Sequence, residues 1–195
     1  PDGFCSVTLH ISLNNIIISP ENPYYKLYDG KFILKKSTNN AQNYDVLVFC
    51  VRNIKTAKIP FFIKHIAPYA FSGCKLLKTI EIPTNSELES IGKGAFFLSS
   101  IETFIIPYRV TQICEGTFAN CYNLKCIEIP LNSKLQKIDE FAFFNSFITK
   151  INLPINLSQI CKNAFDKCTK LQKIDIPLNS ELQKIDECAF FRTSI

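Results

Sequence analysis

Apolar positions along most of this chain recur with a period of 23 or 24 residues. Each recurrence ends in an Ile-Pro or Leu-Pro pair, and the prolines are Pro60, Pro83, Pro107, Pro130, Pro154 and Pro177. One phenylalanine follows each proline at an equivalent place: Phe71, Phe96, Phe118, Phe143, Phe165 and Phe190. The phenylalanine steps alternate between 25 and 22 residues, so two kinds of repeat make a 47-residue unit. This period predicts a solenoid, in which each turn covers the apolar face of its neighbour.

The residues just before each proline predict a short strand. In TIEIP, Ile80 and Ile82 fall on one face and Thr79 and Glu81 on the other, as in a half-buried strand. Proline ends the strand because it has no N–H group to donate to the next rung. Because the segment always recurs in the same direction, we expect a parallel sheet with strands about 4.8 Å apart.

The residues around each phenylalanine predict the other side of a turn. A Leu-x-x-Ile pair precedes the ring and predicts a bend or a very short second strand. Segments such as KGAFFLSS and KNAFDKC predict one helical turn with an inward phenylalanine. The six rings are then expected to form a stacked spine along the solenoid.

The N-terminal quarter departs from this spacing. KFILKK and DVLVFCV are apolar runs joined by the polar STNNAQNY, which predicts a β-hairpin with a long loop. NIIIS, just upstream, is expected to be the strand of an earlier turn, whereas residues 1–14 fit neither kind of repeat. We therefore divide one continuous solenoid into residues 1–53, an incomplete repeat with a hairpin insertion, and residues 54–195, about six turns with the last incomplete.

Charge and hydropathy narrow the classes of function. The net charge of +5 comes from 22 basic and 17 acidic residues that are interleaved along the chain, and only three residues are arginine. This pattern favours a mixed, solvated surface and argues against nucleic-acid binding. No stretch approaches the roughly 18 apolar residues of a membrane span. The chain has no methionine, so we expect it to be part of a longer or processed chain.

Several of the nine cysteines occupy equivalent places in the repeat. Cys74, Cys121 and Cys168 each lie three residues after a spine phenylalanine and are interpreted as small core residues. Such equivalent cysteines lie two turns, or about 10 Å, apart, which is too far for a disulfide. Cys126 and Cys188 are expected to be accessible, and one or both could pair with another chain.

No constellation in the sequence points to catalysis, so we predict that the chain is not an enzyme. There is no Cys-x-x-Cys motif, and the two histidines have no partner at a recognisable spacing, so we predict no metal and no cofactor. A repeat also gives every turn the same residues, whereas a catalytic site needs one unrepeated set.

The motifs L-x-x-I-x-I-P and I-x-x-x-A-F-x-x-C, at a step of 23 residues, resemble the BspA-like leucine-rich repeats of surface-antigen families. The alternation of VTQICEGTFANCYNLKCIEIP with NSKLQKIDEFAFFNSFITKINLP is particularly similar to the protozoan branch. The resemblance implies an α/β, β-rich leucine-rich repeat solenoid with parallel strands on the concave side and helical turns or bends on the convex side. It also implies a role in adhesion at a cell surface.

If the strands line the concave side, their outward residues form two rows that vary from turn to turn. The first row is Thr56, Thr79, Thr103, Cys126, Lys150 and Lys173; the second is Lys58, Glu81, Ile105, Glu128, Asn152 and Asp175. Variation on a fixed scaffold suits specific recognition. We predict that the ligand site comprises Thr79, Glu81, Thr103, Ile105, Cys126, Glu128, Lys150, Asn152, Lys173 and Asp175.

Two binding functions are compatible with these features. The first is a non-catalytic module of a surface or secreted antigen that binds a host or microbial protein, or a glycan-bearing macromolecule. The alternative is a cytoplasmic scaffold that uses the same face on a partner protein, which many unpaired cysteines would suit. The open last turn also predicts end-to-end or edge association.

Overall fold

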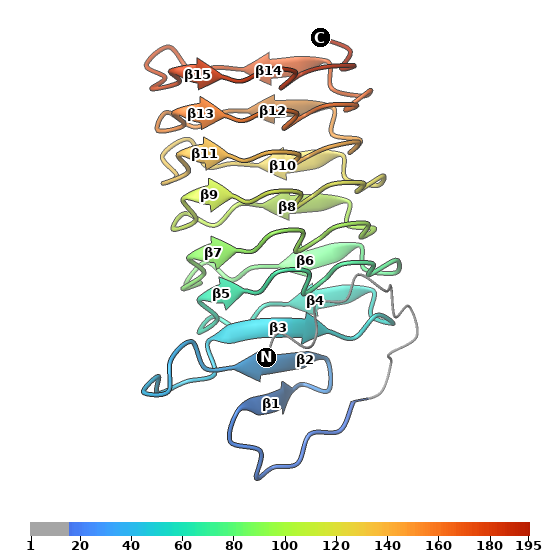
Figure 1. The fold of residues 1–195 in the computed structure, drawn as a ribbon, viewed down its shortest axis with the longest axis vertical. Coiled ribbons are helices and arrows are strands. Elements are labelled where there is room, and N and C mark those ends of the chain that lie inside the picture. The colour runs from blue at the N-terminus through green and yellow to red at the C-terminus, as the bar shows by residue number, and fades with distance from the viewer. Residues whose placement is uncertain (1–15) are drawn as a thin grey trace.

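Each repeat forms one coil of a β-solenoid with two short strands, and the coils stack along a single axis (Figure 1). The computed structural model of the chain describes residues 16–195. The strand before each proline has three residues: β4 (Thr56–Lys58), β6 (Thr79–Glu81), β8 (Thr103–Ile105), β10 (Cys126–Glu128), β12 (Lys150–Asn152) and β14 (Lys173–Asp175). The strand before each spine phenylalanine has two residues: β5 (His65–Ile66), β7 (Ser90–Ile91), β9 (Gln112–Ile113), β11 (Lys137–Ile138), β13 (Gln159–Ile160) and β15 (Lys184–Ile185).

Both rows of strands pair in parallel, as the direction of the repeat predicts. The three-residue strands form a four-stranded sheet in the order β14-β12-β10-β8 and a separate pair β4-β6. In the register of β8 and β10, Phe104 lies beside Ile127 and Ile105 beside Glu128. The two-residue strands belong to a nine-stranded sheet that also includes the N-terminal hairpin.

The core between the two rows is built on the predicted phenylalanine spine. Neighbouring rings from Phe71 to Phe190 are stacked, with centroids 5.0–5.3 Å apart and planes within 20° of parallel. The rings from Phe71 to Phe165 are fully buried. Phe104 packs against both Phe96 and Phe118 from its place on β8. Each coil is therefore held by contacts to the coils on either side of it.

The segments around the spine phenylalanines are not helical turns, and that part of the prediction is wrong. No helix occurs in residues 16–195, and so none there is long and apolar enough to cross a bilayer. In every coil the residues two before and two after the phenylalanine have positive φ, as at Tyr69 (59°) and Gly73 (71°) or Phe141 (55°) and Asn145 (55°). Left-handed residues interrupt a right-handed helix.

In these turns, backbone N–H groups that donate to the next coil alternate with N–H groups that close tight turns within the same coil. The Phe71 N–H donates to the Ala95 carbonyl at 2.8 Å, and Phe118 N–H to the Ala142 carbonyl at 2.8 Å. The same bond, to the residue that precedes the next phenylalanine, occurs between every pair of successive coils. It takes the N–H group that an α-helix would need for its own ladder.

The N-terminal hairpin is present and continues the sheet of two-residue strands. β1 (Tyr25–Tyr28), β2 (Phe32–Lys35) and β3 (Val46–Cys50) form an antiparallel meander, and β3 then pairs in parallel with β5. Residues 16–19 form no strand, so the earlier strand expected at NIIIS is not found there. The register expected for residues 1–14 lies outside the described residues. The division at residue 53 stays a prediction.

Candidate functional site

The variable face is the outward surface of the three-residue strands β4 to β14. Pairing of the three-residue strands places the predicted residues in two rows. In the first row, Thr103 lies beside Cys126, and Lys150 lies beside both Cys126 and Lys173. The second row follows the same order, with Ile105 beside Glu128 and Asn152 beside Asp175. β6, which contributes Thr79 and Glu81, precedes β8 in the stack (Figure 1).

The side chains of the variable face are accessible and mostly uncommitted. Eight of the ten predicted residues are exposed, whereas Cys126 and Asp175 are half-buried. Among these ten, one ion pair is formed, in which Lys173 Nζ lies 2.9 Å from Asp175 Oδ1 on the same strand. The remaining polar groups on this face are thus free to contact another molecule.

The centre of the variable face combines an apolar side chain with negative charge. Ile105 is 54% exposed, and the equivalent positions in the coils before and after it are Glu81 and Glu128. Further along the solenoid, Lys150 and Lys173 lie side by side and make the C-terminal end basic. The face is therefore acidic around its centre and basic at its C-terminal end.

An apolar rim borders the variable face and was missed by the sequence analysis. It consists of the residues that directly follow the prolines: Phe61, Tyr108, Leu131, Ile155 and Leu178. Phe61, Tyr108, Leu131 and Leu178 are at least half exposed, and Ile155 is half-buried. The signal was available, because five of the six coils carry an apolar residue at a position that the core does not require.

The rim ends in an aromatic cleft where the hairpin meets the first coil. Its volume is about 630 Å³, and Tyr28, Lys58, Phe61, Phe62 and Asn85 are among the residues that line it. Phe62 makes edge contacts with Tyr28 at 5.7 Å and with Phe61 at 5.6 Å between ring centroids. A cleft of this size can admit a side chain of a partner.

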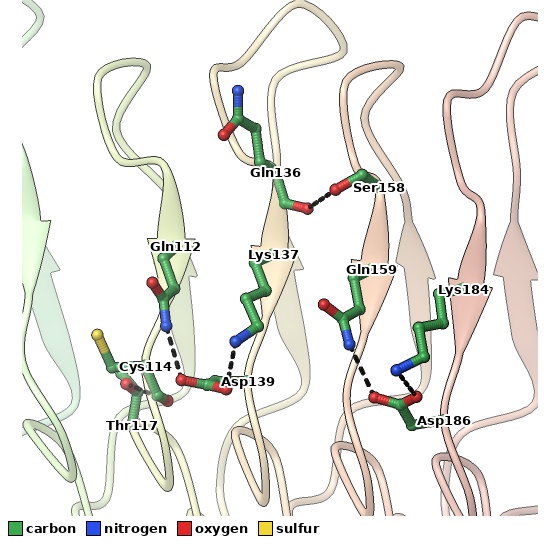
Figure 2. Close-up of polar contacts among 10 residues, drawn as sticks. All are labelled: Gln112, Cys114, Thr117, Gln136, Lys137, Asp139, Ser158, Gln159, Lys184 and Asp186. Carbon is green, nitrogen blue, oxygen red and sulfur yellow. Dashed lines mark hydrogen bonds and ion pairs between the residues drawn. The ribbon is translucent and has the colours of Figure 1, made fainter.

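The outward surface of the two-residue strands β5 to β15, here called the ladder face, is different because its side chains bind one another. Gln112 Nε2 donates to Asp139 Oδ2 at 2.6 Å, and Lys137 Nζ lies 3.2 Å from the other carboxylate oxygen (Figure 2). Two coils later, Gln159 donates to Asp186 at 2.8 Å and Lys184 lies 2.8 Å from it (Figure 2).

The contacts on the ladder face shift the pKa values of its aspartates and lysines in the directions that favour their charged forms. Burial alone would raise the pKa of Asp139, but the hydrogen bond and the charge of Lys137 outweigh it and lower the pKa. Lys184 and then Gln159 lower the pKa of Asp186. Asp139 in turn raises the pKa of Lys137. These groups are held as satisfied ion pairs, an arrangement that supports structure more directly than turnover.

The structure also places the predicted cysteines. Cys74, Cys121 and Cys168 are fully buried, as their interpretation as core residues predicts. Cys188 is exposed and Cys126 is half-buried. The eight cysteines among residues 16–195 are all free thiols, and no cluster of metal-ligating side chains occurs in that range.

Comparison with known families gives one match that covers most of the chain. The model for the BspA type leucine-rich repeat region matches in six copies, over residues 42–133 and 89–195. No curated protein sequence matches the chain.

Solved structures of bacterial leucine-rich repeat proteins are similar in fold. The pneumococcal vaccine antigen PcpA is 31% identical with a TM-score of 0.61, over 64% of this chain and 31% of PcpA. A leucine-rich repeat protein from Eubacterium ventriosum is 24% identical with a TM-score of 0.61, over 93% of this chain and 53% of that one. A third, from Bacteroides ovatus, is 25% identical with a TM-score of 0.58, over 78% and 39%. The chain thus spans a third to about half of the length of these proteins.

Proposed function

Because this chain belongs to the family of BspA-type leucine-rich repeat proteins, we propose that it is a non-catalytic module that binds a macromolecule at a cell surface or after secretion. The similarity to PcpA, a pneumococcal vaccine antigen, supports this localisation. Adhesion to a host or microbial protein is the specific role that we propose.

The observation that carries the proposal is the difference in side-chain pairing between the two faces. On the ladder face, Gln112, Lys137 and Asp139 satisfy one another across coils. On the variable face, exposed residues such as Glu81, Ile105 and Glu128 change from coil to coil, and none of these three has a side-chain partner among the described residues. Recognition needs polar groups that are free before the partner arrives.

The apolar rim favours a protein partner. Exposed aromatic and aliphatic side chains such as Phe61, Tyr108 and Leu131 border the polar rows, and protein interfaces combine such an apolar core with a polar surround. The two carboxylates that flank Ile105 favour a segment in which an apolar side chain lies between basic residues. A glycan on the partner could add contacts in the aromatic cleft.

A paired charge reversal tests the location of the site. The variant Glu81→Lys/Glu128→Lys is compared with Glu89→Lys/Glu140→Lys, which makes the same change of charge at exposed positions outside the two rows. Binding to intact animal and bacterial cells and to immobilised extracellular-matrix proteins is measured for both. We expect the first variant to lose at least about tenfold in affinity and the control to stay within about twofold. Equal binding by both variants, with loss only on changing the loops, would show that the variable face is not the site.

A cytoplasmic scaffold is the second candidate, favoured by the free thiols. Eight unpaired cysteines suit a reducing compartment better than the cell exterior. Labelling of intact cells with an antibody to this chain separates the two. Labelling without permeabilisation supports the surface role, whereas labelling that requires permeabilisation supports the scaffold.

A further inference from the structure

The position three residues after each spine phenylalanine forms a column, buried in every coil but the last, in which cysteine and a hydroxyl residue alternate. Its members in order are Cys74, Ser99, Cys121, Ser146, Cys168 and Thr193. Cys121 Sγ donates to the Phe96 carbonyl at 3.1 Å and contacts Ser99 Oγ at 3.5 Å. Cys168 repeats both contacts with Phe143, at 3.0 Å, and with Ser146, at 3.5 Å. In each case the thiol donates to the carbonyl of the spine residue one coil earlier.

Cys74 lies at the equivalent position in the first coil. The place that a spine phenylalanine holds one coil earlier for Cys121 and Cys168 is held here by Cys50. Cys50, the last residue of β3, takes the backbone role of a spine residue, because its N–H donates at 3.0 Å to Ala70, the residue before Phe71. Both Cys50 and Cys74 are fully buried. The geometry of the column therefore brings the sulfur of Cys74 to the backbone of Cys50.

A hydrogen bond from Arg52 takes the place of the thiol-to-carbonyl bond that Cys74 would make by analogy with Cys121 and Cys168. Its Nη1 donates to the Cys50 carbonyl at 3.1 Å, which is the acceptor that the column provides for Cys74. The same nitrogen donates to Cys74 Sγ at 3.2 Å and to the Ala70 carbonyl at 2.9 Å. Cys74 sulfur is therefore an acceptor facing a cation, whereas Cys121 and Cys168 sulfurs are donors facing carbonyl oxygens.

The electrostatics of the two sulfurs follow from these contacts. The neighbouring Cys50 thiol, together with the charge and hydrogen bond of Arg52, outweighs burial and lowers the pKa of Cys74 to about 7. In the reduced structure Cys50 Sγ donates to the Val51 carbonyl at 3.3 Å. Burial first, and then the neighbouring Cys74, raise the pKa of Cys50. Burial raises the pKa of Cys121 to about 12 and that of Cys168 to about 11. A thiolate is the attacking species in disulfide exchange, so Cys74 differs from its equivalents in reactivity.

We propose that Cys50 and Cys74 are a disulfide-forming pair that joins the N-terminal hairpin to the first full repeat. The oxidant is a small-molecule disulfide, which reacts during folding, after the hairpin and Arg52 have docked on the first repeat and before the sulfurs are fully covered. The Cys74 thiolate attacks one sulfur of the oxidant and releases one thiolate, which leaves a mixed disulfide on Cys74. The Cys50 thiol then loses its proton and attacks the Cys74 sulfur, so that a second thiol leaves. Two electrons pass from the protein to the oxidant, which becomes two thiols.

The bond would close a loop of about 25 residues that includes β4 and β5, and so it would stabilise the end of the solenoid where the hairpin joins. By the loop-entropy relation, and for a chain of this length, the expected rise in the midpoint of thermal unfolding is about 7–14 °C. The proposal does not depend on the identity of the binding partner or on which face binds it.

The experiment refolds the fully reduced chain from urea at pH 7.5 with reduced and oxidised glutathione. Free thiols are then alkylated and disulfide-linked peptides are mapped by mass spectrometry. We expect a peptide pair linking Cys50 to Cys74 and two fewer alkylated sites among the nine cysteines. The same mapping on protein secreted into a bacterial periplasm gives a second measurement that does not require refolding.

The column supplies matched variants. Cys74→Ser introduces the residue that Ser99 and Ser146 already hold at this position, so we expect it to fold and to show no change of melting temperature on adding reductant. Cys121→Ser is the control and should keep both the linked peptide and the wild-type response to reductant. Arg52→Gln is expected to slow formation of the bond at pH 7 several-fold. Soluble wild-type protein in which Cys50 and Cys74 are both alkylated by either route would overturn the proposal.

Discussion

The variable face and the ladder face are built by the same coils but use their outward side chains in opposite ways. On the ladder face, a glutamine in one coil and a lysine in the next share one aspartate, and the arrangement at Asp139 recurs at Asp186. On the variable face, equivalent positions hold Glu81, Ile105 and Glu128, with no recurring contact. Outward residues that bind one another across coils thus serve the stack, and those without such contacts are available for a partner.

The largest expected effect comes from the spine, which both faces share. Phe118→Ala removes a fully buried ring that stacks on Phe96 and Phe143 at 5.3 Å each. We expect a loss of about 3–5 kcal/mol in the free energy of unfolding, measured by urea denaturation. Binding should weaken together with stability, since both faces lose their support. A loss below about 1 kcal/mol would mean that the coils do not depend on the spine.

A smaller effect, confined to binding, is expected at the apolar rim. Tyr108→Ser/Leu131→Ser removes two apolar side chains that are 50% and 58% exposed. Affinity for the partner should fall by about 1–3 kcal/mol, because protein interfaces concentrate their energy in such residues. The free energy of unfolding should change by less than about 1 kcal/mol. Calorimetric titration and urea denaturation of the same samples distinguish the two quantities, and a variant that binds normally would remove the rim from the site.

The smallest effect is expected from the ladder face and depends on pH. The folded-state pKa of Asp139 is lowered, so its contribution to stability is present above the unfolded pKa of about 4 and is lost as pH falls through the folded value. The Asp139 side chain is 22% exposed and that of its partner Lys137 is 39% exposed, so solvent screens the pair and we expect a contribution of about 1 kcal/mol. Unfolding of wild type and Asp139→Asn is compared from pH 6 to pH 3. The difference between them should shrink on acidification, while partner binding at pH 6 should be the same for both.

The parts of the fold that depend on local spacing could be predicted from the sequence. Six prolines and six phenylalanines at regular steps were sufficient to predict parallel strands, the stacked spine and the burial of Cys74. The left-handed residues that replace the helical turns could not be predicted, because positions such as Tyr69 and Phe141 do not carry the glycine that usually marks them. The tertiary environment imposes that conformation on them.

The contacts between coils were less accessible to sequence reasoning. Gln112 and Asp139 are 27 residues apart, and nothing in either local pattern pairs them. Cys50 was not aligned with the spine, because the hairpin that contains it lies outside the repeat; its place became visible only through its bond to Ala70. The individual residues of the binding site remain a prediction, since outward positions are not constrained by the core.

The alternation of cysteine and serine in the buried column imposes a rule of parity on the growth of this molecule. A duplication that adds 47 residues inserts two coils and preserves every Ser99-to-Cys121 type of contact and every glutamine-to-aspartate pair. Adding a single coil would place like upon like, sulfur over sulfur or hydroxyl over hydroxyl, and would leave an aspartate without its amide donor. Chains of this design can therefore lengthen or shorten by even numbers of coils with little disturbance, whereas an odd change creates a fault inside the core.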